Sequence, residues 1–130
     1  MEPYKKIANL LWETSSSNHA STAKLDIMPK NVNKLLVANR GEIALRVVRT
    51  AREMGIPTVA VYAEQDRHAQ YVQMADDAYL LSGDTYKDTY LNEDLLIDIL
   101  QRSGADAVHP GYGFLSEVAS FAQKVLDAGA

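Results

Sequence analysis

The sequence predicts an α/β fold, an open parallel β-sheet with helices on both of its faces. Two observations support this class. Apolar runs typical of buried strands, at residues 34–38 and 58–62, flank an amphipathic segment at residues 42–54, in the pattern of a right-handed βαβ unit. A helix that ends at a glycine and is followed within two or three residues by a strand is expected at Gly55 and again at Gly104.

The remaining elements follow with short connections. In the first helix Ile43, Val47, Ala51 and Met54 form one apolar face, with Ala44 and Val48 beside it. Downstream we expect, in order, a short helix at 68–74, a strand at 78–81, a loop at 82–90, a helix at 92–103 capped by Asn92, a strand at 106–109 and a helix at 116–128 capped by Ser116. If the strand order is 3-2-1-4, the loops after the first and fourth strands meet at the crevice where such sheets bind ligands.

Composition narrows the class of protein. The 130 residues suffice for one domain, and 47% apolar with 23% charged residues is ordinary for a globular chain. A net charge of −4 disfavours a nucleic-acid binder, because no basic field attracts phosphate. The absence of cysteine excludes disulfides, thiolate nucleophiles and Cys-ligated zinc, and no apolar run is long enough to span a membrane. We therefore expect a cytoplasmic protein.

The two ends of the chain differ from this pattern. Residues 1–31 hold a possible short amphipathic helix at residues 3–13 and then a Ser/Asn/Thr-rich stretch, which is typical of a tag, leader or linker. A partner-docking helix on a tether is the alternative. At the other end the helix–glycine pattern recurs at Gly129 with no strand after it. We expect residues 32–130 to be one domain that is truncated at a helix–strand boundary.

The most distinctive stretch is residues 108–117, Val-His-Pro-Gly-Tyr-Gly-Phe-Leu-Ser-Glu. Its glycines permit positive φ and a close approach of a ligand to the backbone, and its proline restricts the chain locally. Tyr112 could stack on a ligand or cover the core. His109 and Glu117 flank the turn and could act as an acid–base pair, although a glutamate at a helix start is also typical of a favourable dipole contact.

The loop after the first strand permits two interpretations. Of the glycines that a G-x-G-x-x-G dinucleotide fingerprint needs, only Gly41 is present, and Glu42 would place negative charge near the pyrophosphate. Glu64 and Asp66 nevertheless have a plausible spacing for a ribose contact. The simpler interpretation makes Asn39 a turn residue and a helix cap.

The first helix also carries three arginines. Glu42–Arg46 and Arg49–Glu53 are spaced i, i+4, which favours a solvated face of ion pairs. The alternative is a subunit interface or an anion contact, since arginine suits both.

Two stretches together resemble the amino-terminal domain of biotin carboxylase, the component of biotin-dependent acyl-CoA carboxylases and of pyruvate carboxylase. They are residues 37–46, Val-Ala-Asn-Arg-Gly-Glu-Ile-Ala-Leu-Arg, and residues 109–117. The resemblance extends over about residues 32–130 and implies a Rossmann-like, pre-ATP-grasp domain. The enzyme so implied is a ligase that carboxylates carrier-bound biotin with bicarbonate and MgATP. General likeness favours the acyl-CoA carboxylases.

The resemblance also implies roles for particular residues. Tyr112, Gly113 and Phe114 match the loop that lines the biotin and bicarbonate side of the family's site, and Glu117 matches its acid there. Val118 departs from the family, which usually has asparagine at that position, so a polar contact there is not implied. The positions used at the family's homodimer interface correspond to Arg46 and Arg49.

The catalytic and metal-binding groups of the family lie beyond Ala130, so we expect none in this chain and expect the fragment alone to be inactive. The implied partners are the rest of the ATP-grasp region, a biotin carboxyl carrier protein, a carboxyltransferase and a second copy of the parent enzyme. Two alternatives stay open. One is a self-sufficient nucleotide- or dinucleotide-binding module, and the other is an interaction scaffold or fusion that uses the helix at residues 3–13.

Overall fold

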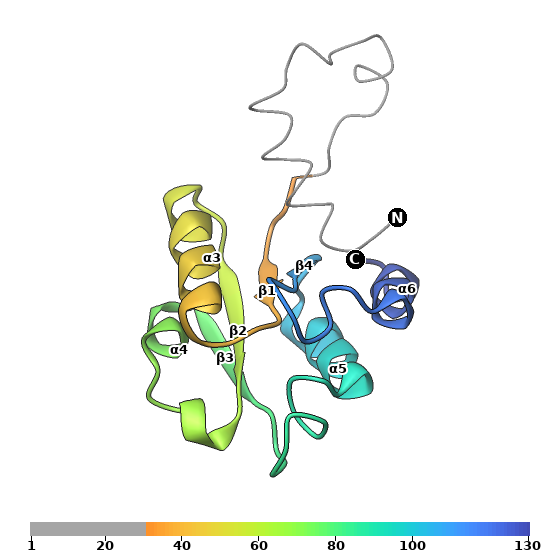
Figure 1. Cartoon of the computed structure of the whole chain (residues 1–130). Coiled ribbons are helices and arrows are strands. Elements are labelled where there is room, and N and C mark those ends of the chain that lie inside the picture. Colours follow the sequence, from red (N-terminus) through yellow and green to blue (C-terminus); the bar gives the residue numbers. More distant parts are fainter. Residues whose placement is uncertain (1–30) are drawn as a thin grey trace, which may run out of the picture.

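The computed structural model describes residues 31–130, so the helix predicted at residues 3–13 lies outside the described residues. Four parallel strands form one sheet in the order β3-β2-β1-β4 (Figure 1). The strands are β1 Leu35–Val37, β2 Thr58–Tyr62, β3 Asp77–Leu80 and β4 Ala107–His109. In the centre Leu36 lies opposite Val59 on one side and Val108 on the other. The predicted strand order is confirmed.

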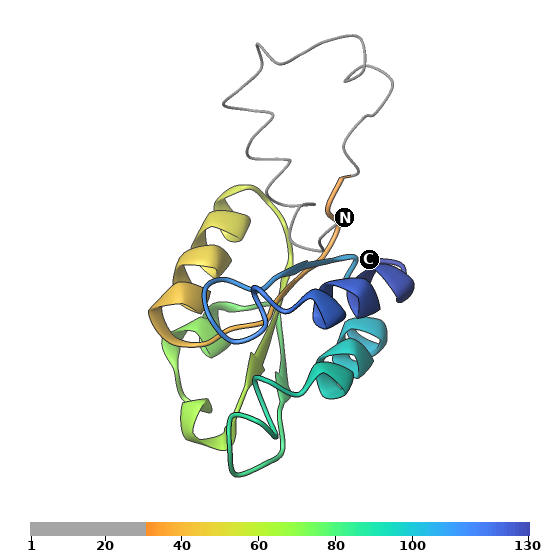
Figure 2. The same ribbon diagram turned by 45° about the vertical axis from the view of Figure 1, so that its right-hand side comes forward.

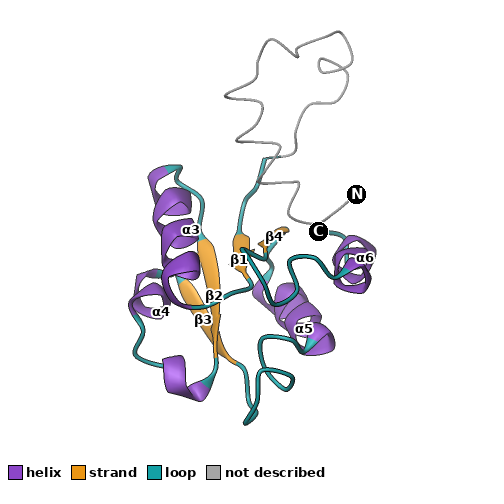
Figure 3. Ribbon diagram, viewed as in Figure 1, coloured by secondary structure: helices purple, strands orange, loops and turns teal. Residues whose placement is uncertain are grey.

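Helices cover both faces of the sheet, as predicted. One face is packed by α3 Gly41–Glu53 and α4 Gln70–Met74, and the other by α5 Glu93–Ser103 and α6 Ala119–Asp127 (Figures 2 and 3). A short 3₁₀ turn, η2 Glu64–Asp66, follows β2. None of the helices within residues 31–130 is long and apolar enough to cross a membrane.

The strands are buried because their side chains alternate between two apolar layers. Leu36, Val59, Val61 and Val108 pack with α5 and α6, whereas Leu35, Val37, Ala60 and Ala107 pack with α3 and α4. Successive residues of a strand point to opposite faces, so each short apolar run contributes to both layers.

The buried face of α3 is shifted from the predicted face toward Ala44 and Val48, which the sequence placed beside it. Its buried residues are Ala44, Leu45, Val48 and Ala51. Ile43 and Val47 are only half-buried, and Met54 is 39% exposed. Ala44, Leu45, Val48 and Ala51 face the sheet, so Ile43, Val47 and Met54 lie at the flank of the helix. That flank becomes the wall of a groove.

The C-terminal ends of α3 and α5 and the start of α5 agree with prediction, whereas the start of α6 does not. Gly55 and Gly104 take left-handed backbone angles after α3 and α5, and the side chain of Asn92 accepts the N–H of Leu95 at 3.1 Å as a cap. The capping role predicted for Ser116 is wrong, since α6 begins at Ala119. The Ser116 N–H instead donates to the carbonyl of Gly113 at 2.9 Å, inside a tight turn that runs to residue 117.

Candidate functional site

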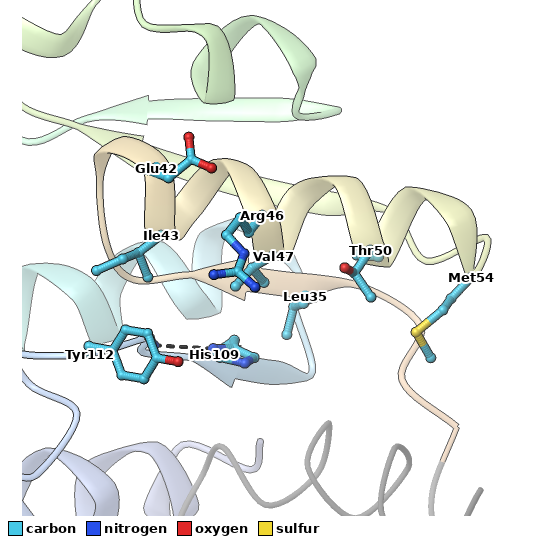
Figure 4. A pocket seen from close by; sticks show the side chains of 11 residues that line it. Leu35, Glu42, Ile43, Arg46, Val47, Thr50, Met54, His109 and Tyr112 are labelled. Atoms are coloured by element: carbon cyan, nitrogen blue, oxygen red, sulfur yellow. Dashed lines mark hydrogen bonds between the residues drawn. The ribbon is translucent and has the colours of Figure 1, made fainter. Parts of the chain in front are cut away.

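A groove lies between the flank of α3 and the loop after β4 (Figure 4). Its volume is about 290 Å³. The apolar part of the lining is Leu35, Ile43, Val47, Ala51 and Met54, and the polar part includes Glu42, Arg46, Thr50, His109 and Tyr112. Arg46 extends from α3 toward the strand and loop that carry His109 and Tyr112 (Figure 4). The structure therefore brings together two residues that the sequence assigned to different roles, Arg46 and Tyr112.

The loop itself has an unusual backbone. Gly111, Gly113 and Phe114 all have positive φ, of 67°, 65° and 44°. A Cβ on Gly111 would come within 2.6 Å of Ile43 Cγ2, so only glycine fits there without displacing α3. At Gly113 an added Cβ would meet nothing within 4 Å. One glycine therefore seats the loop on the domain, and the other leaves open space on its outer side.

Phe114 anchors the far end of this loop. Its ring packs edge-on against Tyr86, with centroids 5.2 Å apart, and against Tyr90 at 5.3 Å. A non-glycine residue at positive φ costs about 1–2 kcal/mol, and the aromatic contacts hold it there. Part of the surface of the Phe114 ring is therefore covered by residues of the domain itself. Tyr112, in contrast, is 73% exposed.

Glu117 lies at the surface, two residues before α6, and does not line the groove. His109 does line it, and its Nδ1 accepts the N–H of Gly111 at 3.1 Å. Burial lowers the pKa of His109 below its usual 6.5, so the imidazole is neutral at neutral pH. The geometry makes His109 an acceptor that steadies the loop, which is a role the sequence alone did not suggest.

Asp66, which the sequence suggested as a ribose contact, already forms hydrogen bonds within the protein. The residue is 8% exposed, and its carboxylate accepts two hydrogen bonds from Arg40, each of 2.7 Å, and one from the Tyr90 hydroxyl at 2.5 Å. The bonds from Arg40 lower the pKa of Asp66, and burial raises that of Tyr90 to about 12. Glu64 is likewise bonded to Arg67 at 2.7 Å. This arrangement argues against the dinucleotide-binding alternative.

The ion-paired face predicted for α3 is wrong. Neither Glu42–Arg46 nor Arg49–Glu53 approaches within 4.0 Å, and within residues 31–130 neither guanidinium has an acidic partner. Both arginines are exposed, because they lie on the side of the helix away from its buried face. They are free to contact another molecule.

Asn39 is not a helix cap. Arg40 occupies the cap position of α3 without a side-chain hydrogen bond, and the Asn39 amide instead donates to the carbonyl oxygens of Pro110 and Tyr112. Sequence reasoning missed this link, although a signal for it existed. In the predicted strand order β1 and β4 are neighbours, so a polar residue directly after β1 can reach the loop directly after β4.

The fold defines a Rossmann-like α/β domain with a glycine-rich loop at the carboxyl end of its central strands, which is the edge where such sheets bind ligands. Residues 31–130 match the family described as biotin carboxylase, N-terminal domain. The chain belongs to this family. Within the described residues no three His, Cys, Asp or Glu side chains gather as a metal site.

Individual relatives agree with the family match. The chain is 55% identical over 98 residues to the biotin-dependent acyl-coenzyme A carboxylase alpha3 subunit of Mycobacterium leprae, covering 75% of this chain and 16% of the relative. It is 53% identical over 92 residues to biotin carboxylase 1 of Bacillus subtilis, covering 71% and 20%. The chain thus spans a fifth or less of the length of these relatives.

A solved structure shares the fold as well. The biotin carboxylase domain dimer of 2-oxoglutarate carboxylase from Hydrogenobacter thermophilus superposes with a TM-score of 0.73 at 48% identity, over 77% of this chain and 22% of that one. Its description includes MgADP, ADP and a bicarbonate anion.

Proposed function

We propose that this chain forms the amino-terminal domain of a cytoplasmic biotin carboxylase, which uses ATP and bicarbonate to carboxylate biotin on a carrier protein within an acyl-CoA carboxylase. The observation that supports this most strongly is the family match over all of residues 31–130. In the parent enzyme the domain would work with the remaining ATP-grasp region and deliver carboxybiotin to a carboxyltransferase.

In this proposal the loop after β4 is one wall of the biotin site. Tyr112 presents an exposed ring that can stack on the bicyclic ring system of biotin, and the open side of Gly113 lets the ligand approach the backbone. Phe114 contributes mainly by holding the loop, since its ring packs on two tyrosines. Glu117 is exposed at the end of the same turn, outside the groove, and its match to the family's acid is what assigns its carboxylate to the biotin site.

The described residues do not fit the phosphates of ATP. The helix after β1 begins with Glu42 in its first turn, and the nearby Arg40 is neutralised by Asp66. A negative side chain at a helix start opposes phosphate binding there. We therefore assign the binding of ATP and Mg²⁺ to the part of the enzyme outside this chain. The same part would carry out the ATP-dependent activation of bicarbonate.

Arg46 and Arg49 are proposed contacts of a homodimer. Both guanidinium groups are exposed and lack acidic partners within residues 31–130. Arginine is the residue best suited to paired contacts at interfaces because its planar fork donates several hydrogen bonds at once. Replacement of either by glutamate in the assembled enzyme should shift the dimer toward monomer in analytical ultracentrifugation.

A chimera tests the proposal. Residues 31–130 would replace the corresponding domain of the Bacillus subtilis biotin carboxylase, and biotin-dependent ATP cleavage would be measured. We expect activity, and we expect Tyr112→Ala to raise the KM for free biotin while leaving the KM for ATP unchanged. Tyr112→Phe is the matched control, since it keeps the ring. Equal effects of Tyr112→Ala on both substrates would contradict the assignment of the loop.

The chain alone is proposed to be inactive. Purified residues 1–130 should neither cleave ATP nor carboxylate biotin, because the residues assigned to those steps lie outside it. Measurable biotin-dependent release of phosphate by the isolated chain would overturn this part of the proposal.

A further inference from the structure

We infer that Asn39 is the positioning residue of the loop at residues 110–114, and that it sets the place of Tyr112 without touching a ligand itself. The importance of this role for substrate binding rests on the proposed function, because that proposal makes Tyr112 a biotin contact. The restraint on the loop can be tested independently of it.

The amide nitrogen and the amide oxygen of the Asn39 side chain both form hydrogen bonds, the nitrogen to the loop after β4 and the oxygen to the backbone after β1. It is 1% exposed. Its Nδ2 donates to the carbonyl oxygen of Pro110 at 2.8 Å and to that of Tyr112 at 2.6 Å, and its Oδ1 accepts the N–H of Arg40 at 2.8 Å. A carboxamide is suited to this position, because it offers two N–H donors and an acceptor without a charge.

The loop needs this donor because its backbone turns both carbonyls toward the same point. Gly111, between them, has φ of 67°, and an added Cβ there would lie 2.8 Å from Asn39 Nδ2. The loop is therefore seated directly on the amide. Without the donor, the buried carbonyl of Pro110 would lose its hydrogen bond, which costs free energy that water does not restore in a buried site.

The remaining restraints act at the ends of the loop. His109 accepts the Gly111 N–H before the crest, and Phe114 is held by Tyr86 and Tyr90 after it. Within residues 31–130, the hydrogen bond to the carbonyl oxygen of Tyr112 comes from Asn39 alone. It thus fixes the backbone of the crest from inside, while the Tyr112 ring stands 73% exposed on the outside.

The first test uses the 130-residue chain and amide hydrogen exchange by NMR. Asn39→Asp keeps the shape of the side chain and the acceptor for Arg40, but turns the donor into an oxygen. We expect the Gly111 and Ser116 amides to exchange about tenfold faster or more, while amides of β2 are unchanged. Asn92→Asp is the matched control, because aspartate caps a helix as well as asparagine. Unchanged exchange at Gly111 and Ser116 would overturn the inference.

A second variant approaches the same contact from the loop. In Gly111→Ala the new Cβ would meet Ile43 Cγ2 at 2.6 Å and Asn39 Nδ2 at 2.8 Å, so the loop must move away from an unaltered Asn39. We expect faster exchange of the Ser116 amide in this variant too. If Asn39→Asp does not fold, this measurement decides, and an unchanged Ser116 amide would refute the role.

The third test separates the positioning role from the proposed function. In the chimera, Asn39→Asp should raise the KM for biotin about tenfold or more with the KM for ATP unchanged, as expected of a misplaced contact. If Tyr112→Ala raises that KM and Asn39→Asp does not, the positioning role fails and the proposed function stands. If neither Tyr112→Ala nor Asn39→Asp changes the KM for biotin of an active chimera, the proposed biotin contact is wrong. The hydrogen-exchange data then decide by themselves whether Asn39 restrains the loop.

Discussion

Replacing Asp66 by asparagine tests whether the loops at the carboxyl end of the sheet are tied together by a buried ion pair. Asp66 lies in η2 after β2, and it accepts hydrogen bonds from Arg40 at the start of α3 and from Tyr90 before α5. Through Tyr90 the network reaches Phe114, whose ring is 5.3 Å away. Asp66→Asn keeps the size of the side chain but removes its charge and turns one acceptor into a donor that faces Arg40.

The expected magnitude follows from burial. Breaking a fully buried pair costs about 3–5 kcal/mol, and an exposed pair contributes about 0–1 kcal/mol. The Asp66 side chain is 9% exposed and that of Arg40 is 34% exposed, so water can replace part of the lost contact. An intermediate loss of about 2 kcal/mol is therefore expected, which corresponds to a fall in Tm of about 8–15 °C for a domain of this size.

Thermal unfolding followed by circular dichroism measures this loss. Glu64→Gln is the matched control, because Glu64 and Arg67 make the same two-bonded geometry, with distances of 2.7 and 2.8 Å, but both are exposed. The control should leave Tm nearly unchanged. A fall in Tm for Asp66→Asn no larger than that for Glu64→Gln would refute the reasoning that burial makes the Arg40 pair important.

Three further outcomes are expected in the isolated chain. Burial lowers the pKa of His109, so as pH falls below about 6.5 this histidine is protonated in the unfolded chain before it is in the folded one, and stability declines. His109→Phe should therefore flatten the decline in Tm between pH 7.5 and 5.5. A decline as steep as that of the unaltered chain would contradict the burial of this imidazole. Asn92→Ala should cost about 1 kcal/mol by urea denaturation, through loss of the cap on Leu95, and no shift of the midpoint would count against the cap. Phe121→Ala, at 1% exposure, should cost about 3–5 kcal/mol in the same assay, and a cost near that of a surface substitution would argue against its burial between α6 and the sheet.

Most of the fold could be predicted because it depends on local patterns. Short apolar runs, the glycines after α3 and α5, and the cap at Asn92 each act over a few residues, and they are where the sequence placed them. The family resemblance was also predicted correctly, because two long motifs carried it.

The errors arose where distant residues decide the outcome. The face of α3 was shifted because helical spacing alone does not say which of two adjacent apolar rows of side chains faces the sheet. Ser116 was misassigned because the left-handed Phe114, held by Tyr86 and Tyr90, delays the start of α6. The link from Asn39 to the loop requires the strand order as well as the residues, so neither motif reveals it alone.

The roles of Tyr112, Gly113, Phe114 and Glu117 at a biotin site remain predictions, as do those of Arg46 and Arg49 at a dimer interface. The residues of the first group lie in one loop, and the structure shows which contacts hold that loop in place. It places Arg46 on the opposite wall of the same groove as Tyr112, and Arg49 outside that groove.

The most direct test of the account is biotin-dependent ATP cleavage by the chimera that carries residues 31–130, compared with its Tyr112→Ala variant. The account predicts an active chimera in which Tyr112→Ala raises the KM for biotin about tenfold or more and leaves the KM for ATP unchanged. A folded chimera without biotin-dependent activity, or an active one whose KM for biotin does not respond to Tyr112→Ala, would contradict it.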